Sequence, residues 1–229
     1  MDKNNILIEF VGLPGSGKTT IQRYFKQKYS DIANFKTNFV DRAGDPVNSV
    51  KTYRVIYFSI RNPRLVIQLI KFWGKSTNIH LNSLPQLVRC IKLAIKVDDW
   101  KNIQNSDILI INQGLIQFMG SLAIPARSTE VQDVEGLLSQ LIYTRVDGFI
   151  HISCDFELAA ARRRDRKHGK SRFEGALNSE QQADLERFQE VLIKSIEKSR
   201  EYGIPQMDLD ASDSLDVNSQ KVMKFIESF

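Results

Sequence analysis

Apolar residues along this chain follow two patterns, short continuous runs and longer stretches with helical spacing. The continuous runs cover residues 4–11, 106–112 and 148–153 and are typical of strands buried on both faces. Shorter runs at 35–41 and 205–212 predict two more strands, each close to turn-forming residues. Between the runs, apolar side chains recur every three or four positions, which predicts helices over 17–29, 50–60, 64–73 and 84–97, from about 155, and over 179–201 and 217–229.

The order of these elements predicts the fold class. Strands alternate with helices along most of the chain, and parallel strands need such crossover connections. We therefore expect an α/β protein with a five-stranded, mostly parallel sheet and helices on both faces. A chain of 229 residues is long enough for one domain of this kind, so residues 1–229 are expected to fold as a single unit.

Composition narrows the class of protein without naming an activity. Hydrophobic residues make up 42% of the chain and charged residues 26%, as in ordinary globular proteins. The two cysteines, Cys90 and Cys154, lack the spacing of a zinc site or a disulfide framework. No apolar run approaches the roughly 18 residues of a membrane span, and the first residues do not resemble a signal peptide. A cytoplasmic protein is expected.

Positive charge is concentrated in one segment. The chain has a formal net charge of +5, yet residues 46–97 contain nine lysines and arginines and no acid, so the remainder carries −4 (+5 minus +9). Such a block suits a phosphorylated substrate, a polynucleotide or an anionic membrane surface. We favour the small substrate. No nucleic-acid-binding pattern accompanies the block, and its short apolar helices are expected to pack on the sheet rather than on a membrane.

The turn after the first predicted strand carries the clearest chemical signal. Gly12, Gly17, Lys18 and Thr19 match GxxxxGK[ST], with a strand before the turn and a helix after it, as this phosphate-binding motif requires. Glycines let the backbone come close to an anion, and the converging N–H groups at the helix start attract it. We expect the loop to bind a nucleoside polyphosphate, ATP in the first place, through Gly12, Gly15, Ser16, Gly17, Lys18, Thr19 and Thr20.

Two side chains of this loop have expected chemical roles. The ammonium group of Lys18 would reach the β- and γ-phosphates and act in catalysis, and the Thr19 hydroxyl would bind Mg²⁺. ATP and Mg²⁺ are therefore the expected cofactors. The motif does not say where the phosphoryl group goes.

The stretch GLPGSGKTT, together with the later arginine-rich segment ELAAARRRDRKHGKSRFE, resembles the P-loop nucleoside and nucleotide kinases, thymidylate kinases most of all. The resemblance implies a three-layer α/β/α P-loop NTPase fold with a helical acceptor-side insertion at about 46–104 and a lid at 164–176. It places Arg162, Arg166 and Arg172 among the lid arginines, the first two as catalytic residues and the third at the acceptor. The alternative is a solvated helix face. A homodimer is also consistent with the family.

The end of the second predicted strand supplies acceptor-side candidates, again by resemblance. Asp41 and Arg42 stand where these kinases place an acid and an arginine facing the acceptor. Asp41 would act in catalysis by accepting the proton of an attacking hydroxyl, and Arg42 would pair with an acceptor phosphate. The alternative is that both belong to the turn that leaves the sheet.

Two departures from the family pattern leave the reaction open. Thymidylate kinases have Asp-Arg after the third strand and related proteins have Asp-Glu, whereas this chain has Asn112 and Gln113, which bring no charge to a metal. The amides are explained equally well as the start of a helix. The acid-free block also replaces the family's acceptor region. Its aromatic residues are expected to fill the core rather than stack on a base: Tyr53, Tyr57, Phe58, Phe72 and Trp73.

We expect an ATP-dependent small-molecule kinase that phosphorylates a nucleotide or nucleoside bound near Asp41, Arg42 and Gln113. A phosphorylated sugar or glycolipid is the alternative acceptor, favoured by the basic apolar block. The alternative of another class is a nucleotide-binding module with little transferase activity, which the two amides motivate. A polynucleotide acceptor is not expected.

Overall fold

The structure is a computed structural model, and several of the residues predicted above to form the site fall outside the part of the chain that it describes. These positions are Asp41, Arg42, Arg166, Arg172 and residues 165–176 of the expected lid. The described residues are 5–30, 35–37, 50–74, 84–102, 107–126, 136–138, 140–164 and 179–229.

The strands form one five-stranded sheet in the order β2-β3-β1-β4-β5, and every pairing in it is parallel. β1 lies in the middle, and its Glu9 pairs with Ile111 of β3 on one edge and Phe149 of β4 on the other. The predicted α/β plan with a parallel sheet is confirmed. The strand bounds are β1 Ile6–Gly12, β2 Phe35–Thr37, β3 Ile108–Ile111, β4 Gly148–Ser153 and β5 Gln206–Asp210.

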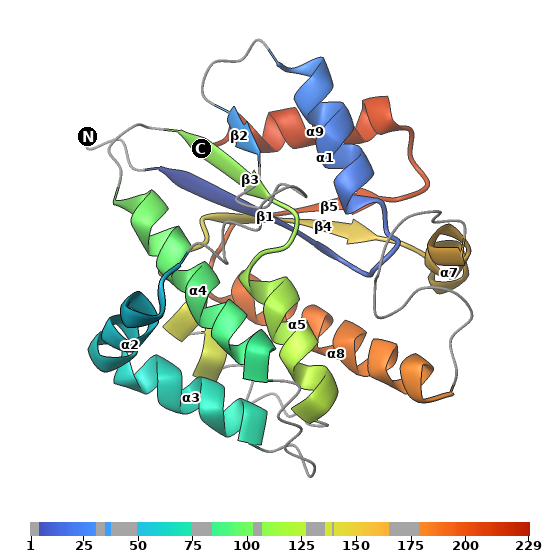
Figure 1. Ribbon diagram of the computed structural model, residues 1–229. Helices are drawn as coiled ribbons and strands as arrows, with labels where there is room; N and C mark the ends of the chain where they lie inside the picture. Colours follow the sequence, from blue (N-terminus) through green and yellow to red (C-terminus); the bar gives the residue numbers. More distant parts are fainter. Residues whose placement is uncertain are drawn as a thin grey trace.

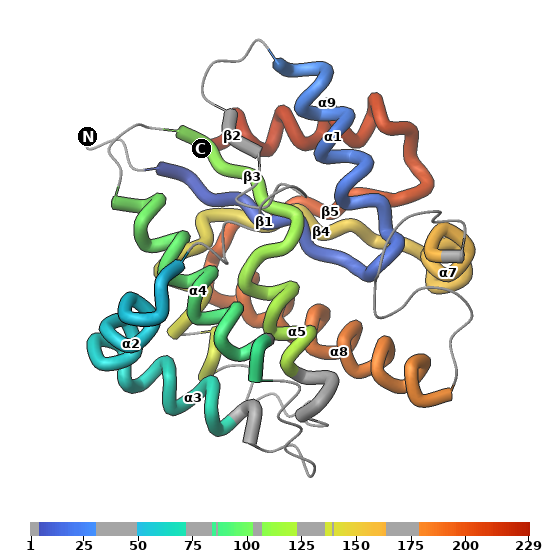
Figure 2. Tube along the Cα trace, viewed as in Figure 1, coloured from blue at the N-terminus to red at the C-terminus, as the bar shows by residue number. Residues whose placement is uncertain are grey.

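Helices cover both faces of this sheet (Figure 1). One face carries α1 (Lys18–Lys28) and α9 (Leu215–Ile226), and the other carries α4 (Leu84–Lys101), α5 (Leu115–Ala126) and α8 (Ser179–Glu201). α2 (Thr52–Arg61) and α3 (Pro63–Gly74) lie outside α4 and α5, and α7 (Phe156–Arg164) follows the carboxyl end of β4, as the trace in Figure 2 also shows. Among the described helices, none combines the length and the apolar character needed to cross a bilayer.

β1 explains why its sequence is a continuous apolar run. Leu7 and Val11 point into the core beneath α4, α5 and α8, whereas Ile8 and Phe10 point into the core beneath α1 and α9. All four are fully buried, because a parallel sheet between two helical layers leaves no strand face in water. Glu9, also fully buried, is the exception in this run.

The segment between β2 and β3 contains α2, α3 and α4, which confirms the three predicted helices. Phe58 is buried in the core as expected. The same expectation was wrong for Tyr53 and Tyr57, which are 65% and 57% exposed. The reason is that α2 turns the opposite side of its surface toward α4. The side chains of Phe72 and Trp73 lie outside the described part.

Two adjacent acids anchor this helical segment. Asp98 and Asp99 are the first acids after the acid-free block, and each receives a two-pronged arginine contact. Arg54 of α2 donates to Asp99 at 3.0 and 2.6 Å, and the buried Arg145 donates to Asp98 at 2.7 and 2.9 Å. Such paired, charge-assisted bonds fix orientation as well as distance. They hold α2 on α4 and α4 on the turn before β4.

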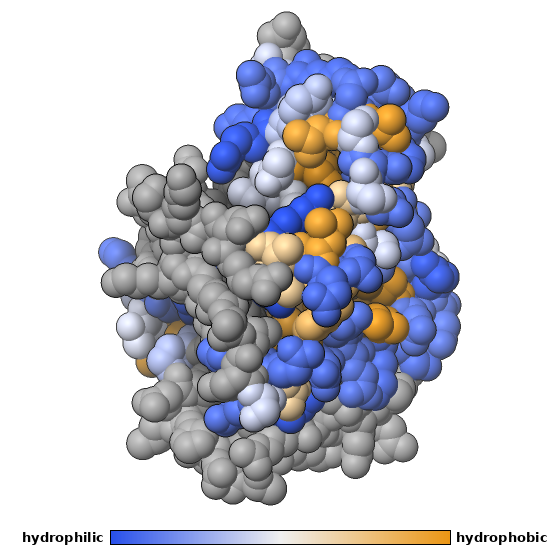
Figure 3. Space-filling view, turned by 90° about the vertical axis from the view of Figure 1, so that its right-hand side faces the viewer, coloured by the Kyte–Doolittle hydropathy of each residue, from blue (hydrophilic) through white to orange (hydrophobic). Residues whose placement is uncertain are grey.

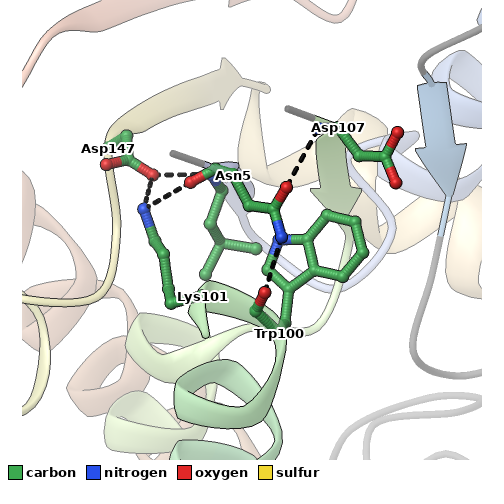
Figure 4. A network of polar contacts seen from close by, with 6 residues as sticks. Asn5, Trp100, Lys101, Asp107 and Asp147 are labelled. Carbon is green, nitrogen blue, oxygen red and sulfur yellow. Dashed lines mark hydrogen bonds and ion pairs between the residues drawn. The ribbon is translucent and has the colours of Figure 1, made fainter. Parts of the chain in front are cut away.

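A polar network joins the amino ends of three strands, far from their carboxyl ends (Figure 4). The Asn5 side chain donates to the Trp100 carbonyl at 2.6 Å and accepts from the Asp107 N–H at 3.0 Å. Lys101 pairs with Asp147 and donates to the Asn5 carbonyl at 2.9 Å. The network satisfies buried polar groups where α4 meets the sheet, which is a structural role.

Gly120 permits the close packing of α5 on α8. A Cβ atom at this position would lie 2.7 Å from Cε2 of Phe188, which is buried on α8. Replacing a helical glycine by alanine normally stabilises a helix by about 1 kcal/mol. Here we predict that Gly120→Ala lowers the free energy of unfolding by about 1–3 kcal/mol, because the core must make room. Urea denaturation measures this.

The Phe188→Leu variant provides the matched control for that prediction. If the contact is the cause, the double variant loses less stability than the two single losses added together. Strict additivity, or a Gly120→Ala protein more stable than the parent, would contradict this packing explanation.

Candidate functional site

Three chain segments leave the sheet close together, at the carboxyl ends of its central strands β1, β3 and β4. β1 is flanked by β3 and β4, so the connections that leave these strands at their carboxyl ends diverge around the end of β1. In open α/β sheets, ligands bind in the crevice at such a switch point. The glycine-rich loop follows β1 directly at this position. Figure 3 looks onto this side of the molecule, where α7 lies and where the described surface is mostly hydrophilic.

The loop is held tightly against α7. Gly15 and Gly17 have φ values of 94° and 95°, a backbone region that side chains with a Cβ atom rarely adopt. A Cβ atom on Gly15 would lie 2.4 Å from the Ala159 carbonyl oxygen of α7. Only glycine therefore fits there, because the loop backbone packs directly against α7.

Lys18 folds back across the loop. Its Nζ atom donates to the carbonyl oxygens of Gly12 at 2.6 Å and Leu13 at 2.9 Å. The N–H of Ser16 donates to Leu13 as well, at 3.0 Å, which closes the turn. The ammonium group thus lies over the loop at the start of α1, where the partial positive charge of the helix end also falls.

Thr19 faces the segment that follows β3. The Asn112 side-chain amide donates to the Thr19 hydroxyl oxygen at 3.3 Å. Thr19 and Thr20 are exposed in the first turn of α1, and Gln113 is exposed beside Asn112. The amide that replaces an expected acid therefore lies at the hydroxyl that is expected to bind the metal.

The oxygen atoms of Thr19 and Asn112 fit an Mg²⁺ ion whose other ligands are phosphates and water. Mg²⁺ takes oxygen ligands, keeps several waters and is often bound by one or two protein groups together with substrate phosphates. Thr19 offers a hydroxyl and Asn112 an amide oxygen. In the part of the chain that the structure describes, no cluster of three or more acidic, histidine or cysteine side chains is present to hold an ion. The fit is to an ion held mainly by phosphates and water.

Two adjacent arginines of α7 reach the phosphate loop in different ways. Arg162 donates from Nη2 to the Ala211 carbonyl at 3.0 Å, and its Nη1 atom would lie 3.6 Å from a Cβ atom on Gly17. Arg163 is buried and donates to the Pro14 carbonyl at 3.1 Å, with its guanidinium over the Phe156 ring. Arg162 therefore lies beside the phosphate loop, and its role as a catalytic lid arginine stays a prediction. Arg163, which the sequence did not single out, supports the loop from behind.

The start of α7 is also well defined. The Asp155 carboxylate accepts from the N–H groups of Glu157 at 2.8 Å and Leu158 at 3.2 Å, which caps the helix. Burial raises the pKa of the neighbouring Cys154 thiol, which opposes formation of the nucleophilic thiolate. Asp155 thus fixes the start of α7, and the Cys154 thiol is poorly suited to act as a nucleophile.

Glu9 and Gln117 were also missed by sequence reasoning. The Glu9 carboxylate accepts from the backbone N–H groups of Ile116 at 3.3 Å and Gln117 at 3.1 Å in the first turn of α5. The Gln117 side chain in turn donates to the Gly12 carbonyl at 3.3 Å. A buried acid in β1 thus holds the helix that contacts the phosphate loop. The only sequence signal was an acid inside an apolar strand.

The Glu9 side chain is closely packed and fully buried. A Cβ atom on Gly114 would lie 2.2 Å from the Glu9 Cδ atom, so only glycine fits above the carboxylate. Burial raises the pKa of Glu9 to about 7, although the N–H groups at the start of α5 pull it down. The group therefore changes its protonation close to neutral pH.

The structure thus brings some of the predicted site residues together. The described group comprises Gly12, Gly15, Ser16, Gly17, Lys18, Thr19, Thr20, Asn112, Gln113 and Arg162. The roles of these residues stay predictions. Asp41, Arg42, Arg166 and Arg172 lie outside the described residues.

Solved structures of two kinases share this fold. A deoxyadenosine kinase from M. mycoides, with the products dCMP and a flexible dCDP bound, has 15% identity and a TM-score of 0.53 over 98% of this chain and 100% of that chain. The same enzyme with dATP has 16% identity and a TM-score of 0.50, covering 97% and 99%. Thymidylate kinase from Candida albicans has 16% identity and a TM-score of 0.57, covering 98% and 92%.

These similarities extend over nearly the whole chain. At such low identities they establish the fold, which is that of P-loop nucleoside and nucleotide kinases. The expected resemblance is thereby confirmed at the level of the fold. No family model matches the chain, and no curated protein matches its sequence.

The raised pKa of Glu9 predicts a pH-dependent stability. The folded-state value of about 7 lies above the ordinary 4.5, so folding favours the protonated acid. Its contribution is complete below about pH 4.5 and is lost as the pH rises through 7. We expect the free energy of unfolding to fall by on the order of 1 kcal/mol between about pH 6 and pH 8 from this group.

Urea denaturation of the Glu9→Gln variant at both pH values tests the assignment. This variant should lose that part of the pH dependence, because it has no proton to release. Glu186→Gln, at an exposed position of α8, is the matched control and should keep the dependence of the parent protein. Identical pH profiles for the parent and Glu9→Gln would show that Glu9 does not titrate in this range.

Proposed function

We propose that the protein is an ATP-dependent kinase that transfers the γ-phosphoryl group to a nucleotide or nucleoside. The observation that carries the proposal is that three chain segments come together at the carboxyl ends of β1, β3 and β4. Lys18 and Thr19 come from the loop after β1, Asn112 follows β3, and Arg162 comes from α7 after β4. The fold shared with two nucleotide-acting kinases supports the same reaction class.

The site's own groups have distinct roles in this proposal. The loop N–H groups and the start of α1 bind the phosphate tail. Lys18, which lies on the Gly12 and Leu13 carbonyls, exchanges these partners for phosphate oxygens when nucleotide binds. Arg162, beside Gly17, adds positive charge where the transferring group becomes more negative. Positioning and charge stabilisation together account for most of phosphoryl-transfer catalysis.

Thr19 and Asn112 would hold Mg²⁺, the first through its hydroxyl and the second directly or through water. Mg²⁺, when bound, neutralises charge on the phosphates. Because the described residues contain no cluster of three or more acidic, histidine or cysteine side chains, the ion would be held mainly by phosphates and water.

On the acceptor side the proposal keeps Asp41, Arg42 and Gln113, with Arg166 and Arg172 on the lid. Gln113 is exposed next to Asn112, on the side of the site away from α7. Asp41 accepts the proton of the attacking hydroxyl. These four charged residues enter by resemblance to the family.

A second candidate function is nucleotide binding with little transfer. The observation that favours it is the Asn112–Thr19 contact, which puts a neutral amide where an acid would strengthen metal binding. The two candidates differ in one measurable respect. Only a kinase releases ADP in proportion to a particular acceptor.

The decisive experiment combines purified protein, ATP and Mg²⁺ with a panel of acceptors. The panel contains deoxynucleosides, nucleoside monophosphates, phosphorylated sugars and a glycolipid. Steady ADP release that depends on a nucleoside or nucleotide supports the proposal. Tight ATP binding without stimulated release favours the binding module, and stimulation by a sugar alone changes the acceptor class.

Lys18 should be essential for transfer. We predict that Lys18→Ala reduces kcat by about 10²- to 10³-fold, as for other lost charge-stabilising donors. Lys26→Ala, on the exposed side of the same helix, should leave kcat unchanged. Both variants should melt within a few degrees of the parent. Unchanged turnover of Lys18→Ala would remove the loop from the mechanism.

Asn112→Asp tests the assigned metal position. The new carboxylate would lie near the Thr19 hydroxyl, so we predict that the Mg²⁺ concentration for half-maximal ATP binding falls about fivefold, equivalent to about 1 kcal/mol. Calorimetric titration at several Mg²⁺ concentrations measures this. Asn102→Asp, at the far end of α4, adds the same charge and should have no such effect. Equal behaviour of the two variants would place the ion elsewhere.

A further inference from the structure

The buried acid of β1 caps a helix that belongs to another part of the chain. The Glu9 carboxylate accepts from the N–H groups of Ile116 and Gln117, and those of Gly114 and Leu115 also lower its pKa. These N–H groups form the free amino end of α5, which a helix normally satisfies with a nearby side chain of its own. Burying a carboxylate is costly, because desolvation penalises the charge. Capping alone does not explain why the acid comes from β1.

The start of α5 leaves the cap to Glu9. The Gly114 carbonyl accepts the first helical hydrogen bond, from the Phe118 N–H at 3.1 Å, so this glycine occupies the N-cap position. It has no side chain to cap with, and a Cβ atom there would lie 2.2 Å from the Glu9 Cδ atom. Gly114 does not have a positive φ. The room taken by Glu9, rather than the local backbone conformation, therefore excludes a side chain at this position.

Capping from β1 ties the start of α5 to the strand that carries the phosphate loop. Glu9 precedes Gly12 by three residues in β1, and β3, which leads into α5, also pairs with β1 (Figure 1). The Gln117 side chain donates to the Gly12 carbonyl at 3.3 Å. Its own amide oxygen is buried and has no hydrogen-bond partner among the described residues. The placement of this amide therefore depends on the helix turn that Glu9 holds.

The segment before this turn touches the phosphate loop at a second point. Asn112, just before the cap, donates to the Thr19 hydroxyl at 3.3 Å. Gly12 is the first residue of the GxxxxGK[ST] motif, and Thr19 is the last. One short segment thus contacts both ends of the motif, and the carboxylate of Glu9 fixes that segment from below.

We propose that Glu9 is a positioning residue for nucleotide binding, which acts on the phosphate loop through the first turn of α5 and Gln117. The inference rests on the proposed function, because it assumes that the loop binds the phosphates of a nucleotide. Glu9 is fully buried beneath α5 and acts through other residues. At metal sites, residues that orient the direct ligands change affinity or activity by about 10- to 100-fold when they are replaced. We expect an effect at the lower end of this range.

Calorimetric titration with ADP and with ATP measures this effect without requiring phosphoryl transfer. We expect Glu9→Ala to bind both nucleotides about tenfold more weakly than the parent protein. Glu186→Ala, at an exposed position of α8, is the matched control and should bind like the parent. Equal affinities of the parent and Glu9→Ala would overturn the inference.

A rescue variant separates positioning from capping. In Glu9→Ala/Gly114→Ser the new hydroxyl can cap α5, and removal of the carboxylate leaves room for the new Cβ atom. We expect this variant to melt a few degrees above Glu9→Ala. Its nucleotide affinity should stay low, because the new cap does not join α5 to β1. Recovery of affinity together with stability would reduce Glu9 to a helix cap and overturn the inference.

Gln117→Met tests the route from the helix to the loop. Methionine has a similar length but cannot donate to the Gly12 carbonyl, so we expect about fivefold weaker nucleotide binding. Added to Glu9→Ala, the substitution should cost less than it costs alone, since both break the same connection. Gln220→Met, at an exposed position of α9, is the matched control. Unchanged affinity of Gln117→Met, or full additivity with Glu9→Ala, would overturn this route.

Failure of the proposed function gives a different result. If the parent binds neither ADP nor ATP, the proposed function and this inference are both overturned. If the parent binds nucleotide without transfer, the binding module is favoured, and weaker binding by Glu9→Ala still supports the positioning role.

Discussion

Backbone pairing of β1 with a parallel strand on each edge is the constraint on which the site depends. β3 and β4 must both run in the direction of β1, so their carboxyl ends meet at the start of the phosphate loop. Residues separated by most of the chain then share one small region. Asn112 reaches Thr19 from one side, and α7 presses against Gly15 from the other.

The loop at this position needs support, because a backbone that presents N–H groups to an anion leaves its carbonyls to be satisfied elsewhere. Lys18 and Gln117 both donate to Gly12, and Arg163 donates to Pro14. Behind Gln117, the buried carboxylate of Glu9 holds the first turn of α5. Positive groups thus line the front of the loop, and the acid lies behind it where it cannot compete for the ligand.

The outer helices α2 and α3 have two faces of different character. Their inner faces complete the core, and the Arg54–Asp99 contact holds α2 on α4. Their outer faces are apolar and basic together, a combination that neither the core nor the phosphate site requires. A fold by itself assigns no activity to such a surface.

The sequence alone was sufficient for the strands, the helices and the phosphate loop, because each depends on local periodicity or on a short run of glycines. The resemblance assigned Arg162 to the lid, a role that stays a prediction. Only the tertiary structure revealed Glu9 and Arg163 as supports, since their partners lie 107 and 149 residues away in the chain. It alone decided that Tyr53 and Tyr57 of α2 face water. Helical spacing defines an apolar face, but which face is buried depends on the neighbours that the helix meets.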